Sequence, residues 1–234
     1  MKKSERTATL AEAEKRLRER YPDSVCALKY GDDPWRLLVM SRLSAQCTDA
    51  RVNEVSVELF REFPTARDMA DGDIARIEEL VRPCGLYRTK AKNIKDASAI
   101  VAERYGGGIP DNMEELLALP GVGRKIANLL LGDVFGEPAI VCDTHCIRIC
   151  GRLGMYPETM HDATRAEMTL RALIDPAEGP DLCHRLVDFG REVCTARSPS
   201  CSSCPLSDIC AHNLKAEKAA AKEKDNTSGR PTVK

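Results

Sequence analysis

The chain has 234 residues, 43% hydrophobic and 30% charged, which is typical of a folded protein long enough to bury a sizeable core. Its net charge is −1, so any contact with nucleic acid must come from a local patch rather than from overall charge. No apolar run reaches membrane-spanning length, and the N-terminal segment lacks the apolar core of a secretory signal. We therefore expect a cytoplasmic protein without a signal peptide or a membrane partner, associated with the nucleoid if the source is a bacterium.

Helical patterns follow one another along the chain, and no stretch alternates like a half-buried strand. Asp33 and Pro34 form a helix-start signal before the apolar run 35–43, which should be a central helix. The fold class is therefore all-α with short connections. The expected helices cover 7–20, 35–43, 49–63, 66–70, 73–81, 86–105, 112–119, 125–135, 143–153, 162–174 and 178–193.

Residues 82–95 contain five cations and no acid, namely Arg82, Arg88, Lys90, Lys92 and Lys95. Such a segment is either a local patch for a nucleic acid or simply a solvated helix face. Charge alone leaves both interpretations open.

The most informative stretch begins with the glycine hairpin 119–123 and continues into Arg124 and Lys125. Gly121 and Gly123 flank one apolar residue, so the backbone can turn tightly and expose successive N–H groups. The following helix adds its own N-terminal donors and the positive end of its dipole. Such a turn can hold a phosphate oxygen without any side chain. A plain helix–glycine–helix corner is the alternative, but the short apolar helices on both sides favour DNA binding.

The eleven cysteines form an odd number and follow no signal peptide, which argues against a disulfide framework. Seven are scattered and should act as small buried hydrophobes. The other four occupy one loop, with six, two and five residues between them, and such spacing usually holds a metal. Zinc more often pairs two separated CxxC knuckles, whereas a single loop of four thiolates suits a [4Fe–4S] cluster. These four are Cys194, Cys201, Cys204 and Cys210.

Taken together, these motifs resemble the helix-hairpin-helix DNA glycosylases that have a Gly/Pro-rich loop and a following aspartate, and among them the endonuclease III family. The resemblance spans about residues 26–212. It implies a bifunctional base excision repair enzyme that removes oxidised pyrimidines from double-stranded DNA and cuts 3′ to the abasic site. It also implies that the four clustered cysteines hold a [4Fe–4S] cluster. The motifs are LSAQCTDARVN (43–53), GLYRTKAKNI (85–94), LPGVGRKIAN (119–128), VCDTHCIRIC (141–150) and the cysteine loop.

The resemblance assigns the catalytic nucleophile to Lys125 and the catalytic carboxylate to Asp143. Loss of a base builds positive charge at C1′, which a carboxylate stabilises and an unprotonated amine traps as a Schiff base. We expect Lys125 to be partly buried against Ile126 and Leu129. Taken alone, Lys125 would suit a simple phosphate contact, and Asp143 would suit the N-cap of the next helix.

The resemblance also places Gln46 in the gap left by a flipped-out base and Leu86 as a wedge in the opposite strand. Without it, Gln46 would be a polar residue at a helix end and Leu86 a core leucine. His145 is a further family position near the site. The family's cysteine loop is basic, whereas here Arg197 is the only charged candidate for a DNA contact.

Two helical lobes with a DNA cleft between them are implied. The first is a helical barrel, 27–137, ending in the helix-hairpin-helix with its hairpin at about 119–125. The second joins 1–26 to 138–216 and holds the iron–sulfur cluster, and 217–234 should be a disordered tail. We expect a monomer.

Three alternatives remain at this point. The related adenine glycosylase lacks the hairpin lysine and uses an early glutamate, which residues 39–43 do not contain. A thymine-mismatch glycosylase is likewise disfavoured by Lys125. A non-catalytic DNA-binding or iron–sulfur scaffold protein would have no need of both Lys125 and Asp143.

Overall fold

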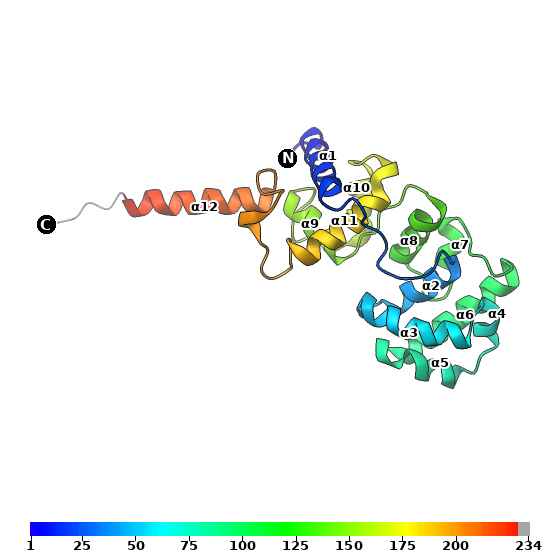
Figure 1. The fold of residues 1–234 in the computed structure, drawn as a ribbon. Helices are drawn as coiled ribbons and strands as arrows, with labels where there is room; N and C mark the ends of the chain where they lie inside the picture. Colours follow the sequence, from blue (N-terminus) through cyan, green and yellow to red (C-terminus); the bar gives the residue numbers. More distant parts are fainter. Residues whose placement is uncertain (229–234) are drawn as a thin grey trace. The chain divides into compact units, whose positions relative to one another are not determined.

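In a computed structural model of the protein, residues 1–228 are described, apart from the side chains of Pro176 and of 222–228. All regular structure in this part of the chain is helical, so the prediction of an all-α fold is confirmed (Figure 1). No helix among the described residues is both long and apolar enough to cross a bilayer. The α-helices are α1 (Lys3–Arg20), α2 (Pro34–Leu43), α3 (Asp49–Glu62), α4 (Ala66–Asp71), α5 (Ile74–Val81), α6 (Tyr87–Arg104), α7 (Met113–Ala118), α8 (Arg124–Phe135), α9 (Thr144–Leu153), α10 (Ala163–Arg171), α11 (Gly179–Glu192) and α12 (Ala211–Ser228). Short 3-10 turns occupy Arg82–Cys84 (η1), Pro176–Glu178 (η2) and Cys201–Ser203 (η3).

The chain divides into two compact units. The continuous unit is Cys26–Val141, and the discontinuous unit joins Met1–Val25 to the chain from Cys142 onward. The hairpin belongs to the continuous unit, and the cysteine loop belongs to the discontinuous one.

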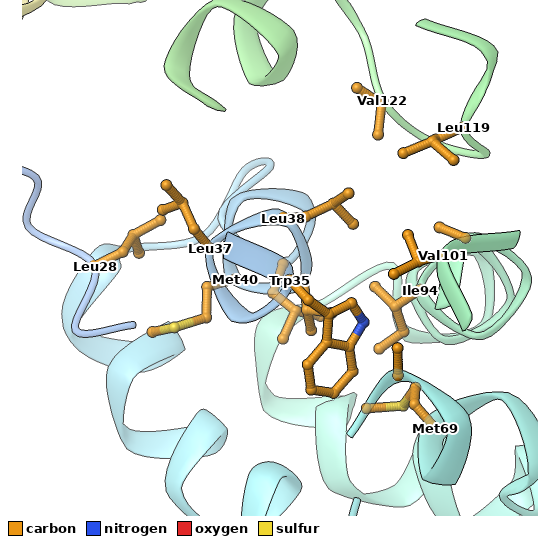
Figure 2. Packing of buried hydrophobic residues seen from close by; sticks show 14 of the residues in the cluster. Leu28, Trp35, Leu37, Leu38, Met40, Met69, Ile94, Val101, Leu119 and Val122 are labelled. Atoms are coloured by element: carbon orange, nitrogen blue, oxygen red, sulfur yellow. The ribbon is translucent and has the colours of Figure 1, made fainter. Parts of the chain in front are cut away.

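Helix α2 lies at the centre of the continuous unit, where it packs against α3, α6 and α8. The Asp33 side chain caps it by accepting from the backbone N–H groups of Trp35 and Arg36, and Pro34 fits its first turn. Figure 2 shows the Trp35 indole beside Met69 and Ile94 in the aliphatic core. The indole nitrogen donates to the Ser98 hydroxyl at 2.9 Å, so this buried polar group is satisfied.

In the discontinuous unit, α11 packs against both α1 and α9. Leu10, Ala13 and Leu17 supply the buried face of α1, as their helical spacing predicts. One buried ion pair crosses this core, with Arg185 of α11 donating to Glu14 of α1 at 3.0 Å.

One expectation about the tail is corrected. Residues 217–228 continue α12 rather than forming a disordered segment, because alanine, lysine and glutamate all favour the helix. The rest of the predicted tail, 229–234, lies outside the described residues.

Candidate functional site

The hairpin joins α7 to α8 in the continuous unit. Val122 N–H donates to Leu119 O at 3.1 Å, and both side chains are buried beneath the turn. Gly123 is the N-cap residue of α8, and it has no side chain with which to cap this helix. The N-terminus of a helix presents backbone N–H groups and the positive end of the helix dipole, which suits it to an anion such as a phosphate.

Gly121 has a left-handed backbone (φ +78°) and lies against two polar side chains that sequence reasoning did not identify. These are Arg42 of α2 and Asn93 of α6. With its amide oriented to suit, the Asn93 oxygen accepts from Arg42 Nε at 3.0 Å and from Arg42 Nη2 at 2.9 Å. Burial lowers the pKa of Arg42. The hydrogen-bonded side chains of Arg42 and Asn93 therefore pack directly against the hairpin at Gly121.

Replacing Gly121 by alanine should destabilise the hairpin. A Cβ there would meet Arg42 Nε and the Asn93 side-chain amide, each at 2.6 Å, and would add the strain of a left-handed backbone. We expect a loss of about 1–3 kcal/mol in the free energy of unfolding, measured by urea denaturation. Gly123→Ala is the matched control, because its φ is −105° and nothing lies within 4 Å of the added carbon. Equal stability of the two variants would contradict the close packing at Gly121.

Lys125 is the second residue of α8 and is exposed. The expectation of partial burial against Ile126 and Leu129 was wrong. Side chains lean toward the N-terminus of a helix, so a residue in the first turn projects past the end of the helix. Its amine is therefore accessible directly beside the glycine hairpin.

Gln46 follows α2 and Leu86 precedes α6, and both are exposed. Both have left-handed backbones, with φ of +55° and +47°. Such a conformation costs a non-glycine residue about 1 kcal/mol or more, and it persists only where the surroundings enforce it. Leu86 is 60% exposed, which excludes the alternative that it is a core leucine.

The basic segment 82–95 does not form a continuous cationic surface. Lys90 is fully buried. Lys92 pairs with Asp96 at 2.6 Å, and Lys95 donates to backbone carbonyls at the end of α4. Arg82 and Arg88 lie over the ring of Tyr87. Of the two interpretations, the patch is therefore the weaker one, since several of the cations have local structural partners.

Asp143 begins α9 in the discontinuous unit. Its Oδ1 accepts from the Cys146 N–H at 2.7 Å, so it is the N-cap of this helix. Its side chain is held in one orientation by that bond and is partly accessible. This capping hydrogen bond is made by Oδ1, so the carboxylate can cap the helix and also stabilise a positive charge nearby.

Behind Asp143, Arg148 ties α9 to the end of α11. It donates to Cys194 O at 2.9 Å and to Gly190 O at 3.3 Å, and it contacts His145 Nδ1 at 3.2 Å. Burial lowers the pKa of Arg148. Gly190 permits this arrangement, because a Cβ there would collide with both the His145 ring and the Arg148 guanidinium. His145 and Asp143 are thus positioned on the same first turn of α9.

Cys194, Cys201, Cys204 and Cys210 line one cavity. Its other walls include Ile149, Leu153, Phe189 and Leu206. No group of three or more His, Cys, Asp or Glu within the described part of the chain is arranged to hold a single metal ion. Four cysteine thiols around one shared cavity are a donor set that suits a [4Fe–4S] cluster.

The chemistry of the donor set fits the same group. Burial raises the pKa of the Cys204 and Cys210 thiols, and the neighbouring cysteine sulfurs raise it further. Four thiolates in this cavity therefore need the positive charge that a cluster's iron supplies. Arg152 Nη1 already donates to Cys194 Sγ at 3.2 Å, and Leu206 N–H points to Cys204 Sγ at 3.4 Å. Arg197 lies exposed in the Cys194–Cys201 loop.

Comparison with known proteins decides the family. The profile of the HhH-GPD superfamily base excision DNA repair protein matches residues 39–176, and the iron–sulfur binding domain of endonuclease III matches 194–210. Endonuclease III of Synechocystis is 44% identical over 195 residues, which are 83% of this chain and 88% of that one. The chain belongs to the endonuclease III family.

Solved structures agree with this assignment. A non-covalent endonuclease III–DNA complex matches with a TM-score of 0.84 at 38% identity, covering 91% of this chain and 98% of that one. A trapped endonuclease III–DNA covalent intermediate matches equally well, with 90% of this chain and 98% of that one covered. This endonuclease III-family chain is a DNA glycosylase and abasic-site lyase of base excision repair, and it carries a [4Fe–4S] cluster.

Proposed function

We propose that Lys125 and Asp143 act on the same deoxyribose of an oxidised pyrimidine nucleotide in double-stranded DNA. The observation that carries the proposal is the exposed Lys125 amine in the first turn of α8, immediately after the glycine hairpin whose last residue, Gly123, is the N-cap of that helix. A phosphate held by those N–H groups would bring the adjoining sugar to the amine. Gly121, Gly123 and Arg124 supply this anchor. A similar protein has been trapped as a covalent DNA intermediate, which supports an amine nucleophile here.

The reaction then proceeds through base release, ring opening, β-elimination and hydrolysis. The Lys125 amine forms a bond to C1′ as the N-glycosidic bond breaks, and the base leaves with a proton. The Asp143 carboxylate stabilises the positive charge that develops on the sugar. Ring opening gives an iminium, which acidifies the C2′ hydrogen. Loss of that proton expels the 3′ phosphate, and hydrolysis of the iminium releases the enzyme.

The remaining residues have supporting roles. Gln46 fills the space vacated by the flipped nucleotide, and Leu86 enters the opposite strand, for which its 60% exposure suits it. His145 and Arg197 contact the DNA backbone from the discontinuous unit. The protein acts as a monomer in the compartment that holds the chromosome, which in a bacterium is the cytoplasm with its nucleoid.

An isosteric change at Asp143 separates its two roles. Asparagine is as good an N-cap as aspartate, so Asp143→Asn should keep the melting temperature while losing the charge that stabilises the sugar cation. We expect single-turnover base release to fall about a hundredfold or more. Asp143→Ala removes the cap as well and should lower both activity and stability. Wild-type turnover in Asp143→Asn would show that capping is the only role of Asp143.

A panel of duplexes, each with one modified base, tests the substrate class. We expect release of oxidised pyrimidines such as thymine glycol, and strand cleavage at abasic sites, with little action on adenine opposite an oxidised guanine. Release of that adenine without strand cleavage would instead assign the chain to the related adenine glycosylases.

A further inference from the structure

The buried Lys90 ammonium links the loops of Gln46 and Leu86, which are both exposed and have left-handed backbones. It donates to Leu43 O at 2.8 Å and to Cys84 O at 2.7 Å. Leu43 ends α2, three residues before Gln46, and Cys84 ends η1, two residues before Leu86. One side chain from α6 thus joins the two short loops that carry these residues. All of these groups lie within the continuous unit.

Burying an ammonium group is costly, so its hydrogen bonds must offset a large loss of hydration. Lys90 is 0% exposed, and burial is the largest cause of its lowered pKa. Both acceptors are backbone carbonyls at the ends of helical segments, where intrahelical donors run out. An apolar residue would fill the same space more cheaply. Lys90 lies one turn before Ile94, on the same buried stripe of α6 as Ile94, Ala97 and Val101. A hydrophobic residue is expected at such a position.

We propose that Lys90 is a positioning residue that fixes the loops of Gln46 and Leu86 at one spacing, so that both side chains enter a DNA duplex together. The proposal rests on the duplex-filling roles of Gln46 and Leu86 given above. Two loops with strained residues would otherwise relax independently, since a left-handed backbone persists only where the structure enforces it. Fixing them before DNA binds removes an ordering cost from the step that extrudes the nucleotide.

The test compares abasic-site cleavage in duplex DNA with cleavage of the same abasic strand alone. A single strand needs no wedge, so its cleavage reports only that the unit is folded and Lys125 is active. Lys90→Met keeps the length and packing of the side chain but removes its donors. We expect the ratio of duplex to single-strand kcat/KM to fall about tenfold, with single-strand cleavage little changed. Should Lys90→Met fail to fold, Lys90→Gln retains a shorter amide donor.

Lys95→Met is the matched control. Lys95 lies on the same helix and also donates to two backbone carbonyls, Ala70 O and Gly72 O. These carbonyls lie at the end of α4 and not beside the loops that carry Gln46 and Leu86. We expect this variant to keep the wild-type ratio even if it loses stability. An unchanged ratio in Lys90→Met, or an equal fall in Lys95→Met, would overturn the proposal.

Variants of Gln46 and Leu86 distinguish a failure of the Lys90 proposal from a failure of the roles proposed for Gln46 and Leu86. The double variant Gln46→Ala with Leu86→Ala should lower the ratio, and adding Lys90→Met to it should lower the ratio no further. A full additional loss in the triple variant would show that Lys90 acts elsewhere, which overturns the positioning role alone. An unchanged ratio in the double variant would instead remove the wedge roles on which the proposal rests.

Discussion

Lys125→Ala is expected to abolish covalent trapping by borohydride on abasic DNA and to lower strand cleavage by about a thousandfold or more. The variant removes the amine that forms the Schiff base but leaves the hairpin N–H groups that hold phosphate. DNA affinity, measured at fixed salt concentration, should therefore fall much less than the cleavage rate does. Lys125 is exposed, so the variant loses no core contact and should fold as the wild type does.

Lys125→Arg is the matched control for this prediction. Arginine retains the positive charge and can contact phosphate, but it cannot be deprotonated in a protein and so forms no Schiff base. We expect it to bind abasic DNA nearly as well as the wild type and to give no trapped adduct. An adduct that persists in Lys125→Ala, or cleavage restored by arginine, would show that Lys125 serves as a phosphate contact.

The second large effect concerns the cysteine cavity. Cys210→Ser should remove one of the four thiolate ligands, and with it most of the bound iron and sulfide and the visible iron–sulfur absorbance. Metal binding energy contributes directly to folding, so the discontinuous unit should lose several kcal/mol of stability, in line with the scale of structural metal sites. Metal and sulfide analysis, followed by thermal unfolding, measures both consequences.

Cys26→Ser is the control for the cysteine prediction. Cys26 is a free, half-buried thiol of the continuous unit and does not line the cavity. We expect its variant to retain full iron and sulfide content. Zinc instead of iron in the wild-type protein, or undiminished iron in Cys210→Ser, would contradict the assignment of these ligands.

Much of the fold follows from local signals in the chain. Five helices begin at or within one residue of the start that the sequence predicts, and in each the side chain of the N-cap residue accepts a backbone hydrogen bond. These N-cap residues are Asp33 (followed by Pro34), Thr48, Asp73, Asn112 and Asp162. A cap and an apolar stripe involve only neighbouring residues, so sequence alone predicts them well. The tail has no apolar stripe, and its structure was predicted less well. Its low hydrophobicity suggested disorder, whereas helix propensity alone extends α12 to Ser228.

The candidate site was predictable where motifs carry the chemistry, as in the hairpin and the cysteine loop. It was not predictable where residues from different helices meet. Arg42 and Asn93 lie far apart in sequence, and only the packing of α2 against α6 brings them under Gly121. Lys90 gave one signal that was missed. It shares a stripe with Ile94 and Ala97, so its place in the interior could have been inferred from helical spacing.

The interrupted course of the discontinuous unit determines the order in which the protein can mature during synthesis. Helix α1 leaves the ribosome well before its buried partner Arg185, and the cysteine ligand Cys210 is made later still. The continuous unit, by contrast, has its whole core available once Val141 has emerged. The half that carries Lys125 can thus be complete while the half that carries Asp143 is still unfinished. A truncated product of interrupted translation would consequently retain a DNA anchor without the full catalytic pair.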